Sequence, residues 1–174
     1  PQDVGKYAIV PGPRDRLEVL LKKIENPVKN FSFMEYTMYT GTYQGIKLTV
    51  MNGGRFSTDT SITSEVMCNA GIQNIIRAGT CGALDENIKV GDIVVVDTIL
   101  RGDGVTPYYV DKNFKTVADK KLRIPCLKLL KVWAAQFIGA VSGPQTRFYA
   151  RREILWKPRE KKARWQWTWF PRQC

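Results

Sequence analysis

Apolar and polar positions along the first half of the chain predict strands and helices in turn. The apolar run Lys6–Val10 is typical of a buried strand. Leucine or isoleucine then recurs at helical spacing over Leu17–Ile24, which predicts an amphipathic helix that ends near Asn26-Pro27. Aromatic and threonine residues over 31–52 predict two adjacent strands that turn at Gln44-Gly45.

The pattern continues with a second helix and two further strands. Ser57 or Thr58 is expected to cap the helix and Gly71 to end it. Its inner face is expected to carry Ile62, Val66 and Ala70. The segment 74–79 predicts a short strand, and the β-branched run Val90–Leu100 predicts another. Strands that alternate with helices indicate an α/β domain with a largely parallel core sheet.

Three loops of small residues follow predicted strands, at Gly12, at 52–54 and at 79–82. Ligands of open α/β sheets bind at the carboxyl ends of strands, where such loops lead into helices. Glycines there let backbone N–H groups approach an oxyanion closely. One such loop alone usually marks only a turn, so the hypothesis of a binding site depends on the three together.

Two arginines and a threonine give these loops their chemistry. Arg16 is expected in the first turn of the first helix, and Arg77 at the end of the strand that precedes Thr80. Guanidinium groups match phosphate or carboxylate oxygens and stay charged at neutral pH, so the pattern predicts a pocket for a small anion. The alternative for Arg77 is a surface ion pair with Asp85 or Glu86. Neither a dinucleotide-binding nor a Walker motif is present.

Composition divides the chain of 174 residues at about Val132. The net charge is +11, of which the last 43 residues carry +7, together with all five tryptophans. We therefore expect an α/β domain over 1–131 and an atypical basic tail over 132–174, which predicts neither a good helix nor a good strand. Since the chain has no histidine, Ser-His-Asp catalysis is excluded. No apolar run is long enough to span a membrane.

Three stretches resemble successive signatures of the nucleoside phosphorylase-I family, which includes purine nucleoside and uridine phosphorylases. They are YAIVPGPRDRLE, YTGTYQGIKLTV and IIRAGTCGALDENIKVGDIVVVD. The resemblance implies a three-layer α/β fold with a central mixed, largely parallel sheet, here incomplete at the C-terminus. It also implies cleavage of a nucleoside by inorganic phosphate, a cytoplasmic homo-oligomer (a dimer or a hexamer of dimers), and neither a cofactor nor a metal.

Residue by residue, the resemblance assigns phosphate binding to Gly12, Arg16, Arg77 and Thr80. Gly79 and Arg55 are further candidates. Many family members place a His-Arg pair before the YTG segment, where this chain has Phe33 and Met34. Arg55 is a candidate replacement for that missing cation.

The family's ribose-binding and base-protonating segments are not readable in 132–174. We interpret this tail as a frame-shifted translation of the family's C-terminal region. Tryptophan has a single codon, and reading two bases on from Trp165 permits VAVDMVSSA, a family-like segment. The alternatives are a basic aromatic tail that binds nucleic acid or a membrane surface, and a phosphorylase subunit without activity. The choice between purine and uridine nucleosides stays open.

Overall fold

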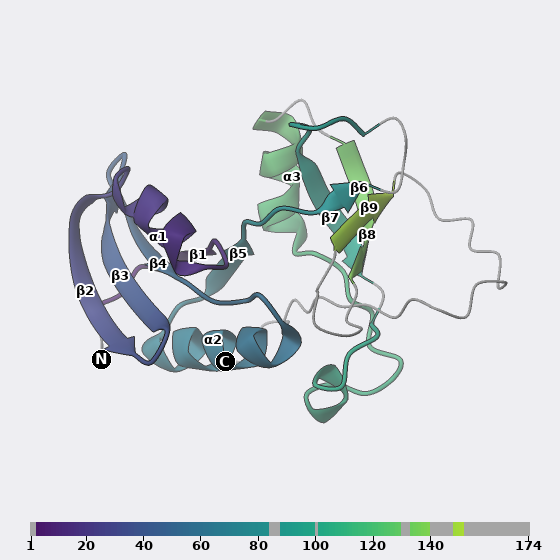
Figure 1. Cartoon of the computed structure of the whole chain (residues 1–174), viewed down its shortest axis with the longest axis horizontal. Helices are drawn as coiled ribbons and strands as arrows, with labels where there is room; N and C mark the ends of the chain where they lie inside the picture. The colour runs from purple at the N-terminus through teal and green to yellow at the C-terminus, as the bar shows by residue number, and fades with distance from the viewer. Residues whose placement is uncertain (1–2, 84–87, 100, 130–132, 140–147, 152–174) are drawn as a thin grey trace, which may run out of the picture. The chain divides into compact units, whose positions relative to one another are not determined.

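The structure is a computed structural model that describes residues 3–83, 88–99, 101–129, 133–139 and 148–151 (Figure 1). The chain forms two compact units, one extending to Gly79 and the other beginning at Thr80, and each is described by itself. Among the described residues, the helices are too short or too polar to cross a bilayer.

The first unit is built on a five-stranded sheet with the strand order β2-β3-β4-β1-β5. Its strands are β1 (Tyr7–Val10), β2 (Glu25–Phe33), β3 (Tyr36–Tyr43), β4 (Ile46–Met51) and β5 (Asn74–Arg77). β1 pairs in parallel with both β4 and β5, whereas β3 is antiparallel to β2 and β4. The sheet is therefore mixed, as expected, and the carboxyl ends of β4, β1 and β5 lie at the same edge.

Two helices cover opposite faces of this sheet, α1 (Arg14–Leu21) and α2 (Ser57–Ala70) (Figure 1). Leu17 of α1 packs with Ile24 and Val50 on one face. Met67 of α2 packs on the other face in a cluster with Ala8, Val10, Tyr36, Met38, Met51 and Ile72. Burial of each large apolar side chain contributes about 1.5–3 kcal/mol. These two cores produce the three-layer α/β arrangement.

Several local predictions are confirmed. β1 and β5 lie where the apolar runs predicted them, and Gly71 ends α2. The turn between β3 and β4 falls at Gln44-Gly45, whose φ angles are 48° and 77°. Two consecutive positive φ angles are typical of the tight turn that matches strand twist in a hairpin.

The predicted end of the first helix is wrong. α1 ends at Leu21, and β2 begins at Glu25 and runs through Pro27. Proline is tolerated there because β2 is the edge strand of the sheet, so a missing N–H leaves no ladder bond unmade. The register shifts between Glu25 and Val28, and Asn26 has a φ of 47°, which together mark an irregular start of the strand.

The predicted cap and inner face of α2 are also wrong in part. Phe56 occupies the cap position without a side-chain hydrogen bond, so neither Ser57 nor Thr58 caps the helix. Ile62 is 46% exposed, although Val66 and Ala70 do pack against the core. The buried side chains of α2 are Asp59, Thr60, Thr63, Ser64 and Met67. The face of α2 toward the sheet is thus largely polar.

The second unit contains a four-stranded sheet with the order β6-β9-β8-β7. Its elements are β6 (Gly82–Ala83), β7 (Val94–Ile99), η1 (Thr106–Tyr108), α3 (Lys120–Leu129), β8 (Trp133–Gly139) and β9 (Phe148–Arg151). β7 is shorter than the predicted strand Val90–Leu100, and Leu100 lies outside the described residues. Arg123 of α3 forms an ion pair with Asp97 of β7 at 2.7 Å.

The tail was expected to contain no good strand, and this expectation is wrong for two segments of it. β8 pairs in parallel with β7, and β9 pairs with β8 in the antiparallel sense. The other residues of 132–174 lie outside the described residues. The predicted domain boundary at Lys131 stays a prediction.

Candidate functional site

The side chain of Arg77 lies across the carboxyl ends of the three parallel strands in the first unit. Its Nε donates a hydrogen bond to the carbonyl oxygen of Gly54 at 2.9 Å, just after β4. Its Nη1 donates to the carbonyl of Val10, the last residue of β1, at 3.4 Å, and to the carbonyl of Ala78. These carbonyls fix the plane of the guanidinium at the edge where ligands of such sheets bind.

Two glycines make room for this guanidinium. A Cβ atom at Gly12 would lie 3.0 Å from Nη2 of Arg77, and one at Gly79 would lie 2.5 Å from Nη1. Gly12 also has a φ of 97°, which side-chain-bearing residues rarely adopt. Its carbonyl accepts a hydrogen bond from the amide of Gly53 at 2.7 Å, so the loops after β1 and β4 are tied together. We call Gly12, Arg16, Gly54, Arg77 and Gly79 the Arg77 cluster.

The electrostatics of the Arg77 cluster favour an anion. Burial, followed by the charge of Arg16, lowers the pKa of Arg77 to about 10, while Asp59 acts in the opposite direction. Arg77 therefore remains a cation at neutral pH, but its charge is held in a poorly solvated place beside another positive charge. An anion between the two arginines would relieve both penalties.

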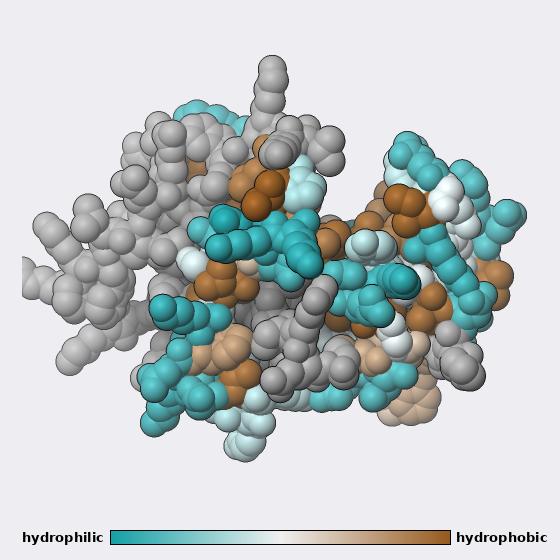
Figure 2. All heavy atoms as spheres, turned by 180° about the vertical axis from the view of Figure 1, so that it is seen from behind, coloured by the Kyte–Doolittle hydropathy of each residue, from teal (hydrophilic) through white to brown (hydrophobic). Residues whose placement is uncertain are grey.

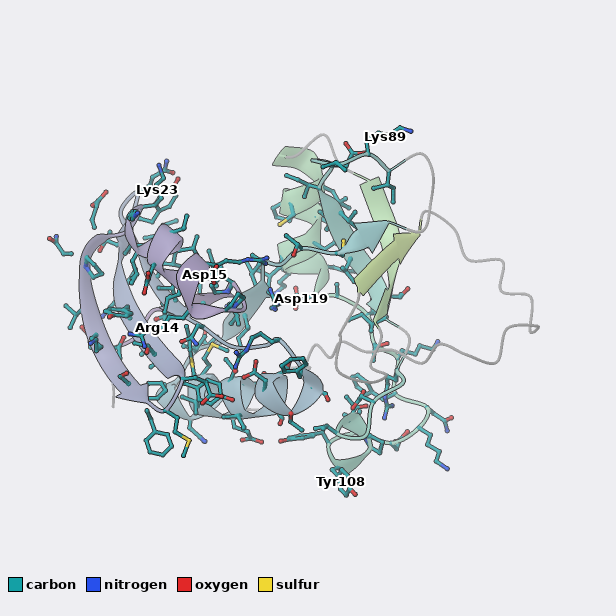
Figure 3. All side chains as sticks on the ribbon, in the orientation of Figure 1. Arg14, Asp15, Lys23, Lys89, Tyr108 and Asp119 are labelled. Atoms are coloured by element: carbon teal, nitrogen blue, oxygen red, sulfur yellow. The ribbon has the colours of Figure 1, made fainter. Side chains whose placement is uncertain are left out.

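Arg16 lies in the first turn of α1, close to the loop at Gly12, because α1 begins immediately after this loop. Pro13 precedes the helix in an extended conformation and makes no side-chain cap. The first amides of α1 and its dipole therefore add to the positive potential of the loop. In Figure 3, the labelled Arg14 and Asp15 mark the start of α1 and Lys23 lies beyond its other end.

Arg55 has a different environment from Arg77. Its Nε lies 3.1 Å from Oδ2 of Asp59, and its Nη2 lies 3.5 Å from Oε1 of Glu35. The guanidinium thus pairs with one carboxylate of α2 and one from the turn between β2 and β3. Its expected role as a phosphate-binding cation stays a prediction, and these ion pairs argue against it.

A buried carboxylate next to this loop is the feature that the sequence did not reveal. Asp59 is 4% exposed, and its Oδ2 accepts the backbone amide of Arg55 at 2.7 Å as well as the Nε of that residue. Burial and the neighbouring Asp59 carboxylate raise the pKa of Tyr36 to about 12. The spacing of four residues between Arg55 and Asp59 on a helix start was the signal that could have identified the pair.

Asn52 braces the same loop from the sheet side. Its Oδ1 accepts the amide of Thr37 at 2.7 Å, and its Nδ2 donates to the carbonyl of Glu35 at 2.7 Å. Asn52 is 2% exposed, so these bonds satisfy an amide that is shielded from water. The loop after β4 is therefore fixed on both sides.

Thr80 belongs to the second unit, and its side chain is exposed. Its expected contact with phosphate stays a prediction. Within the described residues, no group of three His, Cys, Asp or Glu side chains is arranged to hold a metal ion.

Comparisons with known proteins identify the family of the chain. A profile of the phosphorylase superfamily matches residues 6–146. The chain is 32% identical over 147 residues to the uridine phosphorylase of Escherichia coli strain K12, covering 84% of this chain and 58% of that relative. It is 34% identical over 138 residues to the uridine phosphorylase of Salmonella typhimurium, covering 79% of this chain and 53% of that relative.

A more distant relative and a solved structure extend the comparison. The guanosine phosphorylase of Halorubrum lacusprofundi is 28% identical over 117 residues, which cover 67% of this chain and 48% of that relative. The crystal structure of uridine phosphorylase from Vibrio fischeri ES114 matches with a TM-score of 0.70 at 22% identity, covering 84% of this chain and 57% of that chain. The structural likeness concerns the fold. The chain spans about half the length of these relatives.

Proposed function

The chain belongs to the phosphorylase superfamily, and from this premise we propose that it acts in the cleavage of a nucleoside by inorganic phosphate. The products are the free base and a pentose 1-phosphate. The observation that carries the proposal is the Arg77 cluster, where a partly buried guanidinium is held by backbone carbonyls beside the charge of a second arginine.

In the proposed reaction, a phosphate oxygen attacks the anomeric carbon while the bond from this carbon to the base nitrogen breaks. The electron pair of that bond leaves with the base, which takes up a proton. Positive charge develops on the sugar, and the nearby phosphate dianion stabilises it. Arg16 and Arg77 bind and orient the dianion, which is positioning combined with preorganised electrostatics. The groups that protonate the base are not assigned.

Uridine is the substrate that we propose first. Relatives at 32% and 34% identity carry the name uridine phosphorylase, whereas the guanosine phosphorylase stands at 28%. A purine nucleoside such as guanosine is the alternative, and a direct comparison of the two substrates decides between them.

We also propose a homo-oligomer in the cytoplasm. Exposed apolar side chains near the turn between β2 and β3 support an assembly, since Phe33 is 64% and Met34 is 77% exposed. Seen from behind, the described surface carries separate hydrophobic patches between hydrophilic ones (Figure 2). Sedimentation of the purified chain measures the oligomeric state.

The assay for the function measures base release from uridine at increasing concentrations of phosphate. We expect release that saturates with phosphate and yields pentose 1-phosphate, and that is lost in Arg77→Ala. Arg14→Ala is the matched control, because the ion pair that Arg14 makes within the described part of the chain is an exposed helical pair with Glu18. Base release that is independent of phosphate, with free ribose as product, contradicts the proposal. Tight, salt-dependent binding of single-stranded nucleic acid in place of phosphorolysis favours the alternative that the basic tail acts as a binding segment.

A further inference from the structure

The peptide unit between Gly54 and Arg55 is held at both of its ends. Its carbonyl oxygen, from Gly54, accepts the Nε–H of Arg77 at 2.9 Å. Its N–H, from Arg55, donates to Oδ2 of Asp59 at 2.7 Å. A peptide unit is planar, so the orientation of its N–H fixes the orientation of its carbonyl.

We propose that Asp59 is a positioning residue for the phosphate site, because it holds through this one peptide the carbonyl that orients the Arg77 guanidinium. The inference rests on the proposed phosphate-dependent function. Asp59 does not touch phosphate in this account. The carboxylate of Asp59 orients the peptide between Gly54 and Arg55, and the carbonyl of this peptide orients the guanidinium of Arg77.

Three observations make the peptide a suitable link. Asp59 is 4% exposed, so its hydrogen bond to the amide is shielded from competing water. Glycine at 54 offers little steric resistance to rotation of the peptide, so hydrogen bonds must hold it. A negative charge at the N–H end and a positive charge at the carbonyl end polarise the peptide in the same sense, and bonds in such chains strengthen one another.

The charge of Asp59 also reaches Arg77 directly. It opposes the lowering of the Arg77 pKa that burial and Arg16 produce. The same carboxylate also acts on Tyr36, whose pKa it raises, so Asp59 interacts with side chains on both sides of the loop after β4.

The test is the substitution Asp59→Asn, which keeps the shape of the side chain and removes its charge. We expect the dissociation constant for inorganic phosphate to rise about tenfold, within the range by which groups in one hydrogen-bond network couple. The KM for the nucleoside is expected to change less than the KM for phosphate. Glu35→Gln is the matched control, because Glu35 pairs with Arg55 but not with the peptide, and it should leave phosphate affinity unchanged.

A double substitution separates positioning from a merely structural role. In an Arg77→Lys background, which lacks the Nε–H, Asp59→Asn should add no further loss of phosphate affinity. If the role of Asp59 is only structural, Asp59→Asn should lower the melting temperature and should not change the phosphate affinity in either background. An equal loss in both backgrounds likewise overturns the proposal.

A second readout does not require phosphate. The Arg77 Nε–H signal in a nitrogen-15 NMR spectrum should exchange with water about tenfold faster in Asp59→Asn and at the same rate in Glu35→Gln. If the unaltered chain binds no phosphate, the proposed function fails, whereas this exchange rate still tests Asp59. Unchanged exchange in Asp59→Asn shows that Asp59 does not position Arg77.

Discussion

Arg77 ends β5 and Arg55 follows β4, two strands of one sheet with β1 between them, yet the surroundings of the two arginines differ. Arg77 donates to the carbonyl oxygens of Val10, Gly54 and Ala78 and lies near the charge of Arg16. Arg55 is paired with the carboxylates of Asp59 and Glu35. Neutral carbonyls orient a guanidinium without cancelling its charge, whereas two carboxylates cancel it.

We propose that the difference separates an arginine that binds an external anion from one that stabilises the fold. Both arginines lie near glycine-rich loops, so their positions in the sequence alone did not distinguish them. The chemical nature of their hydrogen-bond and ion-pair partners distinguishes them. The following changes test this contrast, beginning with the largest expected effect.

Arg77→Ala should weaken phosphate binding by roughly 100-fold, because hydrogen bonds to charged groups contribute about 1.5–3 kcal/mol each. Arg77→Lys should recover only part of the loss, since an ammonium cannot reproduce the planar fork. Phosphate titration of the two variants measures the effect. Equal phosphate affinity in Arg77→Ala and the unaltered chain would remove Arg77 from the site.

Gly12→Ala should weaken phosphate binding about tenfold and destabilise the fold by roughly 1–2 kcal/mol, because the new Cβ strains the backbone and displaces the guanidinium. Gly71→Ala is a matched control: φ is 98° at Gly71 and 97° at Gly12, but a Cβ at Gly71 meets nothing within 4 Å. Chemical denaturation and phosphate titration should show lost stability in both variants and lost affinity in Gly12→Ala alone. Loss of affinity in both would mean that general strain is the cause.

Phosphate binding should also weaken as the pH rises above about 10, the pKa of Arg77 in the folded chain. Arg77 is a base, so it is charged below this pH and loses the charge that binds the anion above it. We expect the affinity to be nearly constant from pH 8 to 9 and about tenfold weaker at pH 11. Titration with sulfate, which does not ionise further in this range, is the measurement. A flat profile to pH 11 contradicts the assigned role of Arg77.

Arg55→Ala should have the smallest effect on phosphate, less than about threefold, because its guanidinium is already paired with carboxylates. Stability should fall instead, since Asp59 loses its cation while remaining buried. Thermal unfolding and phosphate titration of this variant provide the comparison. A loss of affinity as large as that of Arg77→Ala would place Arg55 in the phosphate site and erase the contrast.

The sequence revealed the parts of the cluster that depend on local chemistry. The apolar runs located β1 and β5, and the arginine at the end of β5 marked the edge of the sheet. β2 was missed because Pro27 usually ends a regular element, and only the position of β2 at the edge of the sheet permits it there.

Long-range pairing accounts for what else was missed. The bond between Arg55 and Glu35 joins residues from separate elements, and nothing in either local segment predicts it. The inner face of α2 was misjudged because it is polar, with Thr63 and Asp59 turned inward while Ile62 is exposed. Hydrophobic periodicity cannot locate a face that is built from hydrogen-bonding side chains.

The match to the phosphorylase superfamily extends to residue 146, beyond the expected boundary at Lys131. The coding DNA tests the frame-shift hypothesis directly, because it either yields the family-like segment in another frame or does not. The proposed phosphate site in the first unit does not depend on the answer.

The central claim is that the Arg77 cluster binds inorganic phosphate, and calorimetric titration of the chain with phosphate tests it most directly. We predict saturable binding at one site per chain, together with a rise in melting temperature as phosphate increases. Both effects should disappear in the Arg16→Ala, Arg77→Ala double variant. Binding of the same affinity in the double variant, or no binding by the unaltered chain, would contradict the claim.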